Sequence, residues 1–277
     1  MTITETQLPD IYRQIIDEQL ATFSQRRSIS DWNSIPDTSQ IPLDNQSHWL
    51  KIPDVISVFV DMKGSTKLSA TTADRDTAGA YQLFTGTAVR LFHEFEASYI
   101  DVRGDGVFGL FNRDEPHRAL AAAVSFKTFS SLEFAGRVKK LTGVDVGCHV
   151  GIDQKTVLVR KIGLRSVGGR TDRQNEVWAG KPINMSAKLA SLSADDEVLA
   201  SERYFRRLTH PCATMSCGCP DGQRKALWTE KTLINDDRFD FTAAYSLKSK
   251  WCATHGAAFC ATLMEADTVP RGKCVGE

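Results

Sequence analysis

The chain has 277 residues and a mass of 30.7 kDa, and its shares of hydrophobic (42%) and charged (25%) residues are those of an ordinary globular protein, which excludes a largely disordered chain. Lys plus Arg and Asp plus Glu both number 34, so the basic excess typical of a duplex nucleic-acid binder is missing. No apolar run reaches the roughly 18 residues of a membrane span, and the amino terminus lacks the pattern of a signal peptide. The seven cysteines are therefore predicted to be mostly free thiols in a cytoplasmic protein.

The first predicted unit, residues 1–50, is an N-terminal helical arm followed by a polar linker. Asp10 can cap a helix whose apolar residues are Ile11, Ile15, Ile16, Leu20 and Phe23. A stretch rich in Ser, Asn, Asp and Pro follows this helix. We expect such an arm to dock on its own domain or on a partner subunit.

Strands and helices alternate through the second predicted unit, residues 51–209. A buried strand (55–60), a helix (74–97) and two short strands (98–103 and 107–111) come first, and Gly104-Asp105-Gly106 between those strands is typical of a hairpin turn. Next come a helix (115–135), two paired strands (144–152 and 156–163), a helix from Pro182, and a final strand and helix (197–208). The pattern predicts an α+β fold with a mixed or antiparallel sheet, most like the ferredoxin-type β-α-β-β-α-β plan.

Two carboxylates in this region are candidate metal ligands. Asp61 ends the buried strand and precedes Gly64, Ser65 and Thr66, which open a helix. A carboxylate there can hold Mg²⁺ while free N–H groups hold phosphate oxygens, or it can simply cap the helix. Asp105 taken alone is an ordinary turn residue. If the strand and the hairpin are neighbours, the carboxylates converge into the usual two-metal clamp for in-line phosphoryl displacement.

A third candidate block lies on the helix that begins near Pro182. Asn184 and Lys188 are four residues apart and therefore share one helix face. An amide and a cation together can orient a ribose and neutralise a phosphate. A solvated surface pair is the alternative.

In this order and spacing, the three blocks resemble those of the class III nucleotidyl cyclases over residues 54–209. The first block is Phe59–Thr66, the second is Gly104-Asp105, and the third is the helix with Gly180, Asn184 and Lys188, where the family usually has Arg in place of the Lys. The Gly-Ser-Thr ending of the first block and the chain length are similar to those of the Pycsar cyclases. These bacterial enzymes make cyclic pyrimidine nucleotides in anti-phage defence.

The resemblance implies that two Mg²⁺ or Mn²⁺ ions bind Asp61, Asp105 and the backbone carbonyl of Met62. It implies that the amides of residues 64–66 cradle the triphosphate. In such cyclases the 3′-hydroxyl of a nucleoside triphosphate attacks its own α-phosphorus and pyrophosphate leaves.

The resemblance also implies how the third block works. Asn184 would orient the ribose, and Lys188 would meet the charge that develops on the α-phosphate. Because the metal ligands and this helix come from different subunits in the family, the implied assembly is a head-to-tail homodimer with two shared sites. Its cyclic product would activate a separate effector.

The base pocket departs from both purine cyclase patterns. At the two base-pocket positions, adenylate cyclases usually carry Lys and either Asp or Thr, and guanylate cyclases carry Glu and Cys. This chain has Asp101 and Val177 there. Val177 cannot hydrogen-bond a base through its side chain, whereas Arg103 shares a strand face with Asp101 and can shorten the pocket. A shorter pocket suits a pyrimidine, with UTP favoured over CTP. The alternatives are a purine cyclase with an atypical pocket and an idle cyclase-like domain that binds nucleotide or a partner.

The third predicted unit, residues 210–277, is a C-terminal extension rich in Cys. It offers the possible ligands His210, Cys212, Cys217, Cys219, Cys252, His255 and Cys260. No paired C-x-x-C occurs among them, so a structural zinc site and ordinary thiols both stay open. Upstream, a cationic loop with Arg165, Arg170 and Arg173 either closes over the triphosphate or is solvated.

Overall fold

The structure, a computed structural model, describes residues 9–164, 173–233 and 236–267. In these ranges nine strands form one sheet with the order β3-β4-β2-β5-β7-β9-β8, while β1 pairs with β2 and β6 pairs with β5 off this path. The strands are β1 (Ser28–Asp31), β2 (His48–Lys63), β3 (Tyr99–Arg103), β4 (Gly106–Phe111), β5 (Gly147–Gly163), β6 (Gln174–Gly180), β7 (Val198–Ser201), β8 (Trp228–Thr232) and β9 (Ala243–Leu247).

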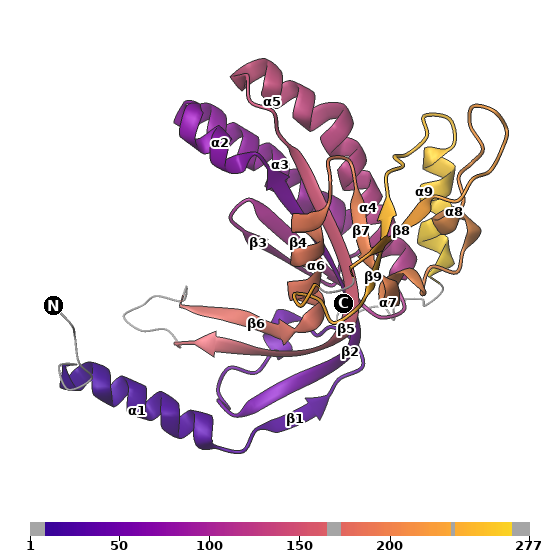
Figure 1. Cartoon of the computed structure of the whole chain (residues 1–277). Helices are drawn as coiled ribbons and strands as arrows, with labels where there is room; N and C mark the ends of the chain where they lie inside the picture. Colours follow the sequence, from indigo (N-terminus) through magenta and orange to yellow (C-terminus); the bar gives the residue numbers. More distant parts are fainter. Residues whose placement is uncertain (1–8, 165–172, 234–235, 268–277) are drawn as a thin grey trace, which may run out of the picture.

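Helices lie on both faces of this sheet (Figure 1). They are α1 (Asp10–Ser24), α2 (Ser65–Thr71), α3 (Asp74–Glu94), α4 (Pro116–Phe129), α5 (Ala135–Thr142), α6 (Lys181–Leu192), α7 (Glu202–Phe205), α8 (Pro211–Thr214) and α9 (Gly256–Ala266), with a 3-10 turn at Thr38–Gln40 and a π-helical turn at Ser130–Phe134. Helices α3 and α4 pack on one face, and α6 packs across β5 and β2 on the other.

The central strands confirm the predicted α+β, ferredoxin-like plan. Along the chain, β2, α3, β3, β4, α4 and β5 follow one another, and β3, β4, β2 and β5 are neighbours in the sheet. Strand β2 pairs antiparallel with both β4 and β5. This arrangement brings the first and second sequence blocks onto adjacent strands.

The main core lies between the sheet and the helices α3 and α4. Val58 and Val60 of β2 are fully buried and alternate with residues that face the other side, as a strand between two layers requires. Phe84 of α3 and Phe126 of α4 meet edge to face with ring centroids 4.9 Å apart. This aromatic contact anchors both helices over β2.

One expectation about the strands is wrong: residues 144–152 and 156–163 are not two paired strands. They form the single strand β5, whose antiparallel neighbours are β2 and β6. Two polar residues between the expected strands have partners in the folded chain, since the Asp153 carboxylate accepts from Arg203 at 2.7 Å and Gln154 Nε2 donates to the Asp54 carbonyl at 3.0 Å. Burial of these paired groups lets the strand continue.

Two other expectations differ from the structure in length. Strand β2 does not end at Asp61 but runs on to Lys63. The helix expected over 115–135 passes through the π-helical turn into α5 and stops at Gly143, whose φ of +75° suits a helix end.

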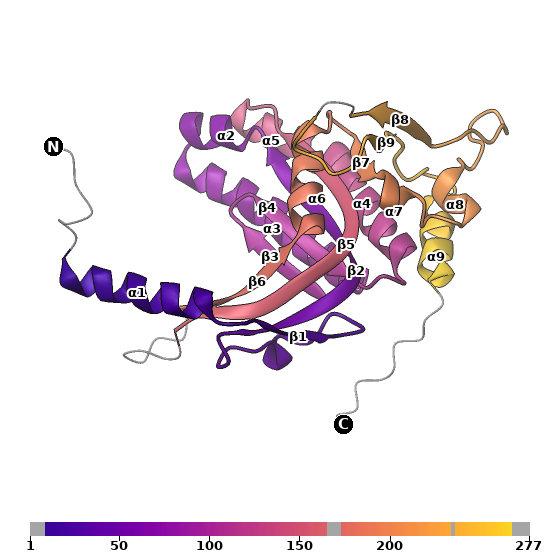
Figure 2. The same cartoon turned by 60° about the horizontal axis from the view of Figure 1, so that its bottom comes forward.

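The N-terminal arm contains the expected helix. Helix α1 has no buried residue and projects from the rest of the chain (Figure 1, Figure 2). Beyond it, β1 pairs with β2, and Ile35 and Ile41 are buried beside β2 and β5. The segment before residue 51 is therefore partly integrated into the fold.

The C-terminal extension adds to the same sheet. Strand β9 pairs with β7 and β8 pairs with β9, while α9 packs beside α4. The predicted division at residue 209 thus marks no break in the sheet. Among the helices of the described ranges, none is long and apolar enough to cross a lipid bilayer.

Candidate active site

The strand β2 and the hairpin β3–β4 bring Asp61 and Asp105 together. Asp61 lies directly opposite Gly106 in the β2–β4 pairing, and Asp105 immediately precedes Gly106. Gly104, with φ of +67°, supplies the left-handed residue that this two-residue turn needs. Burial, and then the negative charge of Asp105, raise the pKa of Asp61. The two carboxylates therefore act on one another, as the sequence predicted if the strands were neighbours.

Gly106 leaves room for the Asp61 side chain on the neighbouring strand. A Cβ at position 106 would lie 3.2 Å from Asp61 Oδ1 and 2.8 Å from Phe59 Cζ. Only a residue without a side chain fits between Arg103 on one strand and Asp61 on the other, because all three lie in one row across the sheet. A side chain at position 106 would displace the Phe59 ring or the Asp61 carboxylate.

The paired carboxylates fit hard divalent cations. Within the described residues, neither Asp61 nor Asp105 forms an ion pair with Lys or Arg. Two half-buried carboxylates this close repel one another, and oxygen ligands of this kind suit Mg²⁺ or Mn²⁺. The side chain of Met62 is buried in the core with 2% exposed, so only its backbone is available as a ligand.

The chain turns sharply after Asp61 into α2. Gly64 has a φ of +81°, and a Cβ there would lie 2.6 Å from the carbonyl oxygen of Asp145, so glycine is needed for this turn. Ser65 and Thr66 form the first turn of α2, where backbone N–H groups have no acceptor within the helix. These free N–H groups therefore follow Asp61 by only a few residues in the chain.

Strand β3 carries the two charged residues predicted for the base pocket. Arg103 and Asp101 form an ion pair of 2.6 Å and lie two residues apart, on one face of the strand. Tyr99 shares this face, and its ring lies 4.8 Å from that of Trp178 on β6. Tyr99 and Trp178 were not among the sequence candidates, because nothing local links a residue of β3 to one of β6.

Val177 lies on the other face of β6. It sits opposite Arg160 of β5 in the pairing, whereas its neighbours Glu176 and Trp178 both contact Tyr99. Since successive strand residues point to opposite sides, Val177 does not face Asp101 and Arg103 within one chain. Its place in the base pocket stays a prediction.

Helix α6 holds Asn184 and Lys188 on the surface that faces away from the sheet. The opposite side of α6 is fixed to the sheet by a 2.8 Å hydrogen bond between the hydroxyls of Ser57 and Ser186. Asn184 is exposed, and Lys188 Nζ donates to the carbonyl oxygen of Arg238 at 2.7 Å. In the described part of one chain, neither residue contacts Asp61 or Asp105.

The cationic loop is only partly described. Arg173 is exposed just before β6. Arg165 and Arg170 lie outside the described residues.

Similarity to curated proteins shows the family to which the chain belongs. No protein-family profile matches the chain. A uridylate cyclase of Propioniciclava tarda is 38% identical over 235 residues, which cover 82% of this chain and 74% of that protein. A uridylate cyclase of Micromonospora echinofusca is 30% identical over 271 residues, or 95% and 86% of the two chains. The chain belongs to the uridylate cyclase family.

Solved structures agree on the fold of this cyclase family member. The guanylyl cyclase Cya2 superposes with a TM-score of 0.56 at 18% identity and covers 71% of this chain and 92% of that chain. The adenylyl cyclase CyaB from P. aeruginosa gives 0.53 at 15% identity, with 72% and 94% covered. These structures confirm the predicted class III cyclase fold, and the curated relatives confirm the prediction of an enzyme in the nucleotidyl cyclase class.

Proposed function

We propose that this chain is a pyrimidine nucleotide cyclase that converts UTP into 3′,5′-cyclic UMP and pyrophosphate, with CTP as the second candidate substrate. The family membership supports a cyclase, and the pairing of Asp61 with Asp105 beside Gly106 is the observation that carries the chemistry. An idle copy of the fold would have no need to keep two mutually repelling carboxylates at one sheet edge.

Different residues of the site would bind the metal ions and the phosphates during cyclisation. Asp61, Asp105 and the Met62 carbonyl would hold two Mg²⁺ or Mn²⁺ ions, which lower the pKa of the 3′-hydroxyl and neutralise the triphosphate. The amides of residues 64–66 bind phosphate oxygens. These contacts align the α-phosphorus for in-line attack by the hydroxyl on the same nucleotide.

Helix α6 completes this site from a second copy of the chain. Asn184 is exposed and Lys188 donates to the Arg238 carbonyl, and neither touches the carboxylates of its own chain, so a head-to-tail homodimer would place them in the partner's site. Asn184 then orients the ribose, and Lys188 stabilises the charge on the α-phosphate. Lys supplies a point charge, where an Arg would form two parallel hydrogen bonds.

The ion pair on β3 supports the choice of base. Arg103 and Asp101 lie beside the ring of Tyr99 on one strand face. A guanidinium donates to a uracil carbonyl and a carboxylate accepts from a uracil N–H, so the pair matches one edge of this base. Val177 would add only an apolar wall to the pocket. Within one chain it faces away from Asp101 and Arg103, so it would need another position to reach the same base.

The product would serve as a second messenger. The resemblance to the Pycsar cyclases supports a role in bacterial anti-phage defence, where the cyclic nucleotide activates a separate effector protein. The effector is a partner only through this diffusing product.

A substrate panel tests the proposal directly. The purified chain is incubated with ATP, GTP, CTP or UTP and Mn²⁺, and products are identified by mass spectrometry. Cyclic UMP from UTP is expected. A cyclic purine would overturn the pocket argument while keeping the chemistry, and absence of any cyclic product from a folded dimer would support the idle binding domain instead.

A further inference from the structure

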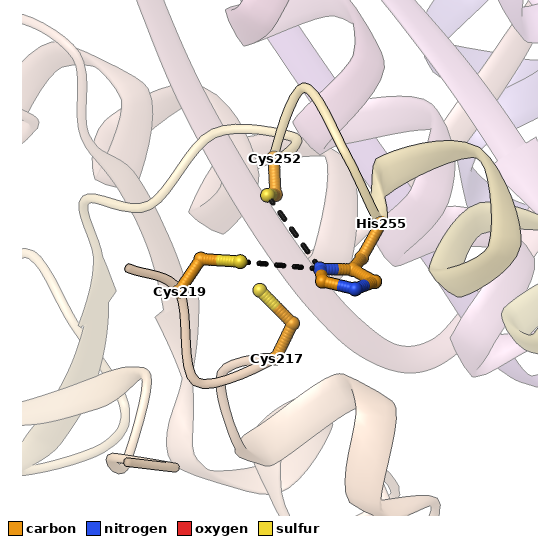
Figure 3. A group of neighbouring side chains, drawn as sticks. All are labelled: Cys217, Cys219, Cys252 and His255. Carbon is orange, nitrogen blue, oxygen red and sulfur yellow. Dashed lines mark hydrogen bonds between the residues drawn. The ribbon is translucent and has the colours of Figure 1, made fainter. Parts of the chain in front are cut away.

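Four side chains of the C-terminal extension converge on one point. The sulfurs of Cys217, Cys219 and Cys252 and a ring nitrogen of His255 all lie within 4.8 Å of one another. Figure 3 shows the three sulfurs and Nδ1 of His255 pointing toward a common centre, with Cys219 Sγ 3.2 Å and Cys252 Sγ 4.0 Å from that nitrogen. None of these cysteines is in a disulfide.

The first pair of ligands comes from a Cys-Gly-Cys loop, residues 214–227. Gly218 between the two cysteines has φ of +95°, and a Cβ there would lie 3.0 Å from backbone atoms of Gly222. This left-handed residue turns both sulfurs to the same side. Backbone hydrogen bonds from Ser216 to the Lys225 carbonyl (2.8 Å) and from Leu227 to the Thr214 carbonyl (2.9 Å) close the loop.

The second pair comes from a Cys-x-x-His turn, residues 251–256, at the start of α9. The N–H of Gly256 donates to the Cys252 carbonyl at 2.7 Å, and a Cβ on Gly256 would lie 2.8 Å from Cβ of Trp251, so this turn also needs its glycine. The same turn brings the Cys252 sulfur to 4.0 Å from Nδ1 of His255.

The spacing matches one tetrahedral ion. With Zn–S near 2.3 Å and Zn–N near 2.0 Å, the ligand atoms of a tetrahedral site are about 3.5–3.8 Å apart, close to the spacing seen here. Three sulfurs and one imidazole are a typical structural zinc set, and soft ligands of this kind exclude Mg²⁺ and Ca²⁺. We propose that Cys217, Cys219, Cys252 and His255 bind one structural Zn²⁺ ion in each chain.

This zinc site would clamp the extension to the catalytic core. Trp251, next to the Cys-x-x-His turn, donates through Nε1 to Ser125 Oγ of α4 at 2.8 Å. The four ligand residues themselves line a pocket of about 230 Å³ whose other walls include residues of α4, α8 and α9. The ion would tie the Cys-Gly-Cys loop to the start of α9 at this pocket.

The opposite end of α9 has its own anchor. Asp267, just past this helix, accepts from Nδ1 of His117 at 2.6 Å and from the N–H of Arg118 at 2.7 Å, both in the first turn of α4. Helix α9 is thus held along α4 at both ends. The zinc cluster fixes one end, and a buried carboxylate fixes the other.

Metal content tests the site without reference to cyclase activity. The full chain, freed of any affinity tag and purified without chelator, is analysed by mass spectrometry of its metals, with an expected content of about one zinc per chain. Cys217→Ala and Cys252→Ala are each expected to lower the zinc content at least about tenfold. Cys212→Ala and Cys260→Ala are matched controls from the same extension and should keep the metal.

A variant could lose zinc because it misfolds, so the site is also tested spectroscopically on the wild-type chain. Metal-free protein is titrated with Co²⁺, and the intense visible bands of tetrahedral cobalt thiolate are expected for the wild-type chain and for Cys260→Ala. The proposal is overturned if the wild-type chain contains no zinc and gives no such bands. It is also overturned if Cys252→Ala keeps full zinc, or if peptide mapping finds a disulfide among these cysteines.

Discussion

The two candidate metal sites of this chain are built in opposite ways. Asp61 on β2 and Asp105 in the β3–β4 turn offer oxygen ligands, and within the described residues neither has a Lys or Arg partner. The cysteine cluster offers sulfur and nitrogen ligands from two loops, and its four ligands already surround one centre. The first site has two side-chain ligands within one chain, whereas the second has a full set of four.

The difference follows from what each ion must do. A catalytic site has to leave coordination positions for substrate oxygens, so its protein ligands are few and sit on a rigid sheet that keeps their spacing. A structural site gains stability from a full set of ligands, and binding energy there is folding energy. Exchangeable ions are therefore expected at the carboxylates, and a permanent ion at the cysteines.

The largest effect should come from the carboxylates. Asp61→Asn or Asp105→Asn removes a metal ligand and should lower the rate of cyclic nucleotide formation at least about 10³-fold, with zinc content unchanged. Asp114→Asn, an exposed residue just beyond β4, is the matched control and should keep full activity. Product formation is measured by mass spectrometry. Near-normal turnover in Asp61→Asn would rule out Asp61 as a ligand of the catalytic metal ions.

Loss of a cysteine ligand should act on stability instead. Cys252→Ala is expected to lower the free energy of unfolding by about 3 kcal/mol, because α9 loses its clamp on α4. Chemical denaturation followed by circular dichroism measures this change, with Cys260→Ala as the control. If Cys252→Ala were as stable as the control, the two sites would not differ in the way proposed.

Mixing two inactive variants tests whether the carboxylate site is shared. In a head-to-tail dimer of one Asp61→Asn chain and one Asn184→Ala chain, one site carries both changes and the other carries neither. Since half of randomly mixed dimers are mixed and each has one intact site, about a quarter of wild-type activity should return. Unfolding and refolding the two variants together, then assaying the mixture, gives the measurement; each variant refolded alone is the control. No recovery from a dimeric mixture would place all site residues in one chain.

The smallest effect concerns the pH dependence of stability. The pKa of Asp61 in the folded chain is raised by burial and by Asp105. Between the pKa of Asp61 in the unfolded chain and its higher pKa in the folded chain, the folded chain therefore binds more protons. The free energy of unfolding falls as pH rises through this window. At neutral pH without divalent ions, Asp61→Asn should therefore raise Tm by about 1–3 °C. Differential scanning fluorimetry from about pH 4 to pH 7 checks this; a lower Tm for the variant at neutral pH would contradict it. Added Mn²⁺ should remove the advantage of the variant.

Local chemistry made several features predictable. The Gly104-Asp105 turn and the strand before it are encoded by neighbouring residues, so the approach of Asp105 to Asp61 followed once the two strands were placed side by side. Pro182 in the first turn of α6 was an equally local signal. These elements depend on few distant contacts.

Other features depend on partners far away in the chain. Asp153 and Gln154, which lie between the two expected strands, continue a single strand because Arg203 and the Asp54 carbonyl form hydrogen bonds with them. The contact of Tyr99 with Trp178 joins β3 to β6, elements whose sequence carries no shared pattern. A single sequence holds no signal for such pairings.

The sequence by itself determined the order of the elements, the cyclase family blocks and the set of possible metal ligands, because periodicity, turn residues and spacing are properties of neighbouring positions. Only the tertiary structure decided which ligands meet. It selected Cys217, Cys219, Cys252 and His255 from the seven candidates of the extension, and it left Asn184 and Lys188 apart from Asp61 within one chain. The physical reason is that a coordination sphere of a few ångströms is set by how loops and strands pack, and this packing depends on the whole core.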